Sequence, residues 1–267
     1  MISSRENEIA FVHIPKCGGQ SIRNVMRSIS EAEEIRGIVD KGAGTFDYTH
    51  LTLQQLQSLE PAFLESLSTL ESFCIVRDPF KRLPSSLRQR FAAYHGKDLR
   101  EISQGDLIRE VQLADQYLSQ GDIPYGFVHF TPQHQFIELN GKQVVRKVAD
   151  ISQVDDVFEW LKSHYGAVVA QKTKNKTKVP SSAVARFYIR SVKPMVGQRL
   201  VDATPGWVKR AIRNATLTDD YSTNLIPEEL KNEFVQKHYQ RDFELHKQAL
   251  AAPFFDRYPE TRPRETT

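Results

Sequence analysis

Short apolar runs alternate with longer amphipathic segments along most of this chain. Residues 9–14 and 72–76 are apolar runs bounded by polar residues, a pattern typical of strands buried within a sheet. Residues 144–148 give a third candidate strand. Because helical periodicity separates these runs, the pattern predicts an α/β fold with a central, mostly parallel sheet flanked by helices in a single domain.

Helical periodicity occupies most of the sequence between and after the candidate strands. The predicted helices are residues 21–29, capped by Ser21; 51–70, with a joint at Pro61; 80–94, with Pro84 in the first turn or at a kink; and 103–119, 132–139, 154–165 and 227–250. Residues 37–47 are rich in glycine and predict a loop. The predicted domain covers residues 1–252, including a variable basic segment at 166–221, and residues 253–267 are expected to form a surface tail.

Composition narrows the classes of protein that this fold could serve. The chain has 36 basic and 33 acidic residues, and its formal charge of +3 does not indicate a nucleic-acid partner but tolerates an anionic ligand. Its two cysteines match neither a disulfide framework nor a metal-ligand spacing. No segment has the roughly 18 apolar residues of a membrane span, and residues 1–8 do not have the pattern expected for the apolar region of a secretory leader. We therefore expect a soluble, cytoplasmic bacterial protein, or alternatively a Golgi-type protein without its anchor.

The junction between the first strand and the first helix carries the residues of an anion site. Glycines at 18 and 19 let the backbone approach a ligand closely, and a helix start offers unpaired N–H groups to an anion. Lys16 adds a full positive charge. Since Lys16 precedes both glycines, the loop is not a Walker A motif. The alternative is an ordinary strand-to-helix turn with a surface lysine.

A second candidate follows the strand at 72–76. Arg77 comes where that strand ends, which is where ligands bind in open α/β sheets, and its guanidinium can hold a phosphate through two hydrogen bonds. Ser85 lies eight positions later, where its hydroxyl could reach the same phosphate. The alternative is a surface arginine paired with Asp78.

Together the two segments resemble a known family. His-Ile-Pro-Lys-x-Gly-Gly-x-Ser at 13–21 and Arg-Asp-Pro-x-x-Arg-x-x-Ser at 77–85 are similar to motifs of sulfotransferases that use 3′-phosphoadenosine 5′-phosphosulfate (PAPS), particularly the carbohydrate type related to heparan sulfate 2-O-sulfotransferase. The resemblance implies a P-loop-kinase-like sulfotransferase fold, PAPS as donor, PAP as product and no metal. It implies that the 5′-phosphosulfate is bound by Lys16, Cys17, Gly18, Gly19, Gln20 and Ser21, and the 3′-phosphate by Arg77 and Ser85.

Weaker matches extend the resemblance along the chain. His50 lies between the motifs, where relatives carry a catalytic base, and the segments 132–137 and 239–243 resemble later family patterns. The family asparagine is Asn175 or Asn214. A reaction follows in which His50, with an imidazole pKa near neutral, takes the proton of an acceptor hydroxyl while Lys16 stabilises the leaving group. Alternatively, His50 caps the following helix.

The resemblance leaves the acceptor and two residue roles open. The basic residues between 172 and 213 favour an acidic or glycan acceptor, so we expect a carbohydrate or glycolipid hydroxyl. Cys17 replaces the usual threonine; it is either a reactive thiol at a helix N-terminus or, as we favour, a passive loop residue. His13 is expected to orient its neighbours. Two other functions stay open: a PAPS- or PAP-binding protein without catalysis, and a nucleotide phosphotransferase.

Overall fold

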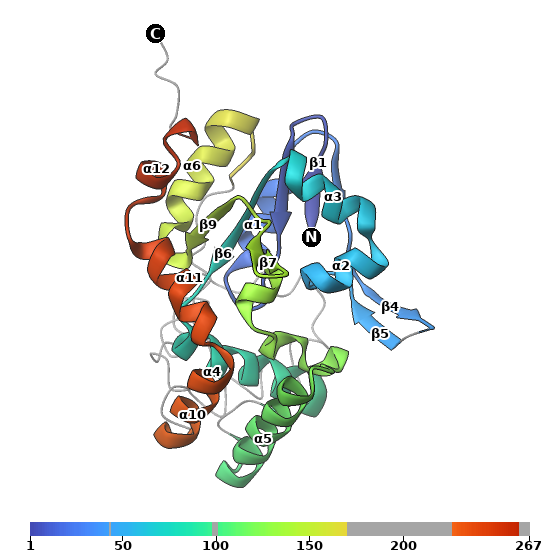
Figure 1. The fold of residues 1–267 in the computed structure, drawn as a ribbon, viewed down its shortest axis with the longest axis vertical. Helices are drawn as coiled ribbons and strands as arrows, with labels where there is room; N and C mark the ends of the chain where they lie inside the picture. Colours follow the sequence, from blue (N-terminus) through green and yellow to red (C-terminus); the bar gives the residue numbers. More distant parts are fainter. Residues whose placement is uncertain (43, 98–100, 170–225, 262–267) are drawn as a thin grey trace, which may run out of the picture. The chain divides into compact units, whose positions relative to one another are not determined.

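Five strands form the central sheet of the protein, in the order β3-β1-β2-β6-β9 (Figure 1). Their bounds are β1 (Ile2–Ser4), β2 (Ile9–Val12), β3 (Ala32–Glu34), β6 (Glu71–Val76) and β9 (Lys147–Asp150). β2, β6 and β9 pair in parallel, whereas β1 is antiparallel to both β2 and β3. β1 alone therefore runs against the other four strands, and the predicted mostly parallel sheet of a mixed α/β fold is confirmed.

The structure is a computed structural model, and it describes residues 1–42, 44–97, 101–169 and 226–261. These residues belong to one compact unit. Most of the basic segment lies outside the described residues, and so do both candidates for the family asparagine, Asn175 and Asn214. No helix among the described residues is long and apolar enough to cross a membrane.

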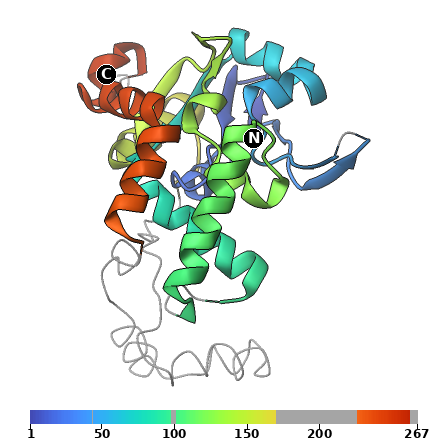
Figure 2. The ribbon, with the colours of Figure 1, turned by 60° about the horizontal axis from the view of Figure 1, so that its bottom comes forward.

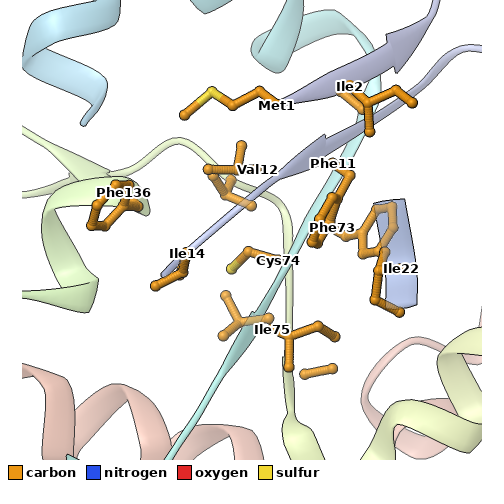
Figure 3. Packing of buried hydrophobic residues seen from close by; sticks show 14 of the residues in the cluster. Met1, Ile2, Phe11, Val12, Ile14, Ile22, Phe73, Cys74, Ile75 and Phe136 are labelled. Carbon is orange, nitrogen blue, oxygen red and sulfur yellow. The ribbon is translucent and has the colours of Figure 1, made fainter. Parts of the chain in front are cut away.

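The two central strands form because nearly every one of their side chains is buried. β2 is buried throughout, and β6 is buried from Ser72 onward, as expected for inner strands covered on both faces. In the core, the rings of Phe11 and Phe73 lie 5.0 Å apart, and Ile22 of the first helix packs close to them (Figure 3). The parallel register pairs Val12 with Cys74. The carboxyl ends of β2 and β6 consequently meet at one edge of the sheet.

Helices surround this sheet and extend below it in Figure 1. Their bounds are α1 (Gly19–Met26), α2 (Leu53–Leu59), α3 (Pro61–Thr69), α4 (Pro79–Arg90), α5 (Gln104–Gln120), α6 (Val154–Tyr165), α10 (Glu228–His238), α11 (Gln240–Leu250) and α12 (Phe254–Arg257). α1 packs against α6, and α11 packs against β9 and β6. A second hydrophobic cluster joins α4, α5 and α10, which Figure 2 shows side by side. The 3-10 helix η3 (Tyr125–Phe130) contributes Phe127 and Phe130 to it.

Most predicted helices are confirmed, with differences at their ends. α2 and α3 divide at Pro61 as predicted, whereas the predicted helix at 227–250 is two helices that meet at Tyr239. α4 continues through Pro84 and passes into a π-helical turn, Phe91–His95. The predicted helix at 132–139 is a shorter 3-10 helix, η4 (Gln133–Phe136), followed by a two-residue strand, β7 (Glu138–Leu139).

Three predictions of local structure are wrong. Ser21 does not cap α1, because Gly18 is the N-cap and Ser21 lies inside the first turn. Residues 37–47 hold a hairpin of β4 (Ile38–Lys41) and β5 (Gly44–Asp47) where a loop was expected. The third strand lies at Lys147–Asp150 where 144–148 was predicted, since charged residues at both its ends are buried beside partners.

The remaining differences concern the two ends of the described chain. No apolar run marks β1 or β3; Ser4 is buried in β1 because its hydroxyl donates to the carbonyl oxygen of Ser30 at 2.7 Å. After Pro253, where a surface tail was expected, α12 buries Phe254 completely in the main core. Short strands without an apolar run, and a proline-rich segment near the C-terminus, thus both add residues to the core that the sequence pattern did not predict.

Candidate functional site

The Lys16 loop (residues 13–18) connects β2 to α1 and has an unusual backbone. Lys16 and Gly18 both adopt left-handed conformations, with φ of 64° and 79°. Gly18 is the N-cap of α1, and no side chain caps the helix start. The first N–H groups of α1 are therefore not satisfied by a capping side chain, and together with the positive end of the helix dipole they suit an anion.

The close approach of the His13 ring requires a glycine at position 19, the first residue of α1. A Cβ atom at this position would lie 2.1 Å from Cδ2 of His13, which is far closer than any real contact. The imidazole of His13 therefore packs directly on the backbone at the start of α1. This packing fixes the direction in which the helix start faces.

Arg77 and Lys16 come together because β2 and β6 are parallel neighbours. Nη1 of Arg77 donates to the backbone oxygen of Lys16 at 3.3 Å. The side chain of Lys16 extends to α4, where its Nζ donates to Oε1 of Gln89 at 3.3 Å. The two predicted motifs thus form one site at the carboxyl edge of the sheet.

This site carries positive charge that the described residues do not neutralise. Burial, together with the positive charges of Arg77 and Arg88, lowers the pKa of Lys16 to about 8. No carboxylate in the described part of the chain forms an ion pair with Lys16 or Arg77. Clustered cations of this kind favour an anionic ligand, which would reduce their mutual repulsion.

Two residues of α4 near this site were missed by the sequence reasoning. Arg88 and Gln89 follow Ser85 by three and four positions, so all three lie along one face of α4. Ser85 itself is half-buried there. The helical spacing from Ser85 is the signal that could have identified Arg88 and Gln89.

The second arginine of the Arg-Asp-Pro motif has a supporting position. Arg82 is fully buried, its Nε donates to the backbone oxygen of Pro15 at 3.1 Å, and its Nη2 donates to that of Thr131 at 2.7 Å. Arg82 therefore fastens the Lys16 loop to the segment that follows η3.

Cys17 is a passive member of the loop and not a reactive thiol. It is fully buried, and its thiol donates to Oε1 of Gln133 at 3.1 Å. Burial raises the pKa of the Cys17 thiol to about 12, so the thiolate is absent at neutral pH. The expectation of a lowered pKa at the helix N-terminus is wrong, and the burial of the thiol supports the interpretation of Cys17 as a passive loop residue.

Gln133 joins the two motifs and shows why the later segments matter. Its side-chain oxygen accepts from the backbone N–H of Arg77, and its amide nitrogen donates to the backbone oxygen of Arg77, both at 2.8 Å. The buried carboxylate of Asp242 accepts from the backbone N–H of Gln133 at 2.7 Å and from that of His134 at 2.9 Å. The segments 132–137 and 239–243 are thus packed together behind the site.

His50 lies beside the Lys16 loop in a fixed tautomer. Its Nδ1 donates to the backbone oxygen of His13 at 3.0 Å; a carbonyl can only accept, so Nδ1 carries the proton and Nε2 has the lone pair. The ring of His50 lies 4.4 Å from that of His13 and 5.5 Å from that of His129. His13 therefore orients His50 through its carbonyl group.

Two expectations for His50 are wrong. Burial lowers its pKa to about 3, so its imidazole is neutral throughout the physiological range and does not titrate near pH 7. His50 also does not cap the following helix. Thr52 caps α2, because its hydroxyl accepts from the backbone N–H of Gln55 at 3.2 Å. The side-chain oxygen of Gln55 in turn accepts from the backbone N–H of Thr52 at 2.9 Å.

A cavity of about 640 Å³ opens next to His50. The hairpin β4–β5, the helix α2 and residues 121–125 supply most of its lining, and Thr131 and Gln135 supply further parts. His50 is the only histidine of the described chain that lines it. Burial lowers the pKa of His129 to about 3, and the positive charges of His50 and Lys16 act in the same direction, so His129 lies near both the cavity and the Lys16 loop.

These features define an α/β protein with a cationic site, suited to an anion, at the carboxyl edge of its sheet, beside a neutral histidine and a cavity. The model of the Sulfotransferase family matches residues 1–247, and the chain belongs to this family. It is the family of carbohydrate sulfotransferases that includes heparan sulfate 2-O-sulfotransferase, as the motifs implied. No curated protein and no solved structure matches the chain.

Proposed function

We propose that the protein transfers the sulfuryl group of PAPS to a hydroxyl group of a carbohydrate or glycolipid. The observation that carries this proposal is the joining of Lys16 and Arg77, without an ion-pairing carboxylate among the described residues, at an uncapped helix start. The family match over residues 1–247 supports a sulfotransferase domain at 1–252 with the P-loop-kinase-like sulfotransferase fold.

In this proposal each of the two motifs binds a different anionic group of the donor. The N–H groups at the start of α1, with Gly18, Gly19, Gln20 and Ser21, bind the 5′-phosphosulfate, and Cys17 supports the loop from beneath. Arg77 and Ser85 bind the 3′-phosphate, and Arg88 adds positive charge nearby. The residues present therefore fit a ligand with two separate anionic groups.

The reaction uses the two sides of the site for two different tasks. Nε2 of His50 accepts the proton of the acceptor hydroxyl as the oxygen attacks sulfur in line. Lys16 stabilises the negative charge that grows on the leaving PAP. Because Nδ1 of His50 is committed to the carbonyl of His13, the ring presents only Nε2 to the acceptor. This chemistry requires no metal.

The proposal is tested by comparing nucleotides in thermal unfolding. We expect PAP to raise the melting temperature by several degrees and ATP, which lacks a 3′-phosphate, to raise it far less, since at equal concentration the ligand that binds the folded protein more tightly stabilises it more. Arg77→Ala should remove most of the PAP effect. Arg109→Ala is the matched control, because Arg109 is an exposed arginine of α5. Equal responses to PAP and ATP would refute the proposal.

A further inference from the structure

The His50 cavity has a charge opposite to that of the Lys16 loop. Its described lining includes two carboxylates, Asp47 at the end of β5 and Asp122 after α5, and no lysine or arginine. Asp122 is exposed and Asp47 half-buried, so both carboxylates are accessible to a molecule in the cavity. A carboxylate or sulfate group on an acceptor would meet repulsion there.

The rest of the lining suits an uncharged, hydroxyl-rich molecule. Amide and hydroxyl side chains from Gln54, Ser58 and Gln135 offer donors and acceptors, and the rings of Phe46 and Tyr125 offer flat apolar surface. Sugars present both kinds of surface, since C–H groups cover the faces of the ring and hydroxyls its rim. The volume of about 640 Å³ lies within the range of small-molecule binding sites.

The position of His50 makes this cavity the place where the acceptor reacts. His50 lines the cavity and has its Nε2 lone pair free to accept a proton. From these observations, and resting on the sulfotransferase function proposed above, we propose that the acceptor is an uncharged carbohydrate and that Asp47 and Asp122 select against anionic glycans. This narrows the expectation of an acidic or glycan acceptor, which depended on basic residues outside the described chain.

The proposed transfer balances as follows. The acceptor hydroxyl oxygen forms a bond to sulfur, and the bond between sulfur and the bridging oxygen of the 5′-phosphosulfate breaks. PAP departs with that electron pair, and the hydroxyl proton passes to Nε2 of His50 and then to water. No oxidation, reduction or further reactant is involved.

The test compares uncharged acceptors with anionic ones. Radiolabelled PAPS is offered with neutral gluco-, galacto- and manno-oligosaccharides, and with oligogalacturonides as free acids and as methyl esters. We expect label in uncharged members, with kcat/KM for an ester about tenfold or more above that of its acid at low salt. This preference should shrink as salt rises, because ions screen exposed carboxylates.

The double variant Asp47→Asn, Asp122→Asn identifies the source of the preference. Asparagine at 47 keeps the oxygen that accepts from the N–H of Thr49 at 2.9 Å, so the hairpin should fold as before. We expect the ratio of ester to acid to fall to about threefold or less. Glu65→Gln removes the same charge from α3, outside the cavity lining, and should leave the ratio unchanged.

The outcomes separate this inference from the function beneath it. If PAP does not stabilise the protein, the proposed function fails whatever the acceptors show. If PAP stabilises it but acids react as well as esters, or no uncharged member is labelled, the inference is overturned. An unchanged ratio in the double variant would equally overturn the role of the two carboxylates.

Discussion

The Lys16 loop and the His50 cavity are neighbours with opposite electrostatics. Lys16 of the loop lies near the positive charges of Arg77 and Arg88, and burial together with these two charges lowers its pKa, whereas the cavity presents two carboxylates. Between them lie buried histidines that stay neutral because burial lowers their pKa values. In the function proposed above, this contrast would let one site attract an anionic donor and offer an uncharged acceptor a separate surface.

Removing the proposed base should have the largest effect on this arrangement. We expect His50→Asn to reduce sulfuryl transfer by about 10²- to 10⁴-fold, because no group would then accept the hydroxyl proton. The asparagine amide can still donate to the carbonyl of His13, so the loop should keep its shape. Single-turnover transfer from radiolabelled PAPS measures the loss.

The control for His50→Asn is the same substitution at the neighbouring histidine, His129. His129→Asn alters a ring 5.5 Å from His50 that does not line the cavity, and it should cost far less activity. PAP affinity should be preserved in His50→Asn. Equal losses in the two variants would remove His50 from the role of base.

Lys16 should matter to the reaction more than to donor binding. We expect Lys16→Ala to lower transfer by roughly 10²- to 10³-fold, because the interaction with the leaving group strengthens in the transition state. PAP should bind only a few times more weakly, since Arg77 and the helix start remain. A drop in affinity as large as the drop in rate would instead assign Lys16 to donor binding alone.

The smallest effect concerns pH and follows from the depressed pKa of Lys16. With a pKa of about 8 in the free protein, Lys16 loses its charge as the pH rises above 8. A bound anion favours protonated lysine and raises its pKa, so binding takes up a proton and weakens with rising pH, by at most tenfold per unit. Titration calorimetry with PAP from pH 7 to 9.5 should show this decline.

Lys16→Arg supplies the comparison, because arginine stays charged throughout this range. Its PAP affinity should be nearly constant from pH 7 to 9.5. The same decline in Lys16→Arg would mean that another group, and not Lys16, titrates in the loop.

Much of the sheet and of the anion loop could be predicted because their sequence signals are local. Inner strands such as β2 and β6 are apolar at nearly every position, and glycines beside a helix start mark a close backbone approach. The predicted position of β9 was wrong because the strand includes a buried lysine, Lys147. Glu71, at 2.8 Å, and Glu260 neutralise the charge of this lysine. Such pairing joins residues distant in sequence, and no local pattern reports it.

The pKa values and the cavity could not be predicted for a related reason. The imidazole of His50 is deprotonated at neutral pH because packing removes it from water, and Cys17 is inert because it is buried against Gln133. The pKa of each side chain depends on which segments, distant in sequence, cover the residue. Arg88 was missed although its helical spacing from Ser85 is visible in the sequence, because the sequence does not show that α4 brings its charge near Lys16.

By itself, the sequence determined the family, the parallel core strands and the candidate residues for an anion site, because motif and periodicity are properties of adjacent positions. Only the tertiary structure decided that Lys16 and Arg77 share one site, that His50 is held as a neutral imidazole with its proton on Nδ1, and that Asp47 and Asp122 line the same cavity. The physical reason is that charge repulsion and desolvation act through space. They depend on what surrounds a side chain, and folding alone brings those surroundings together.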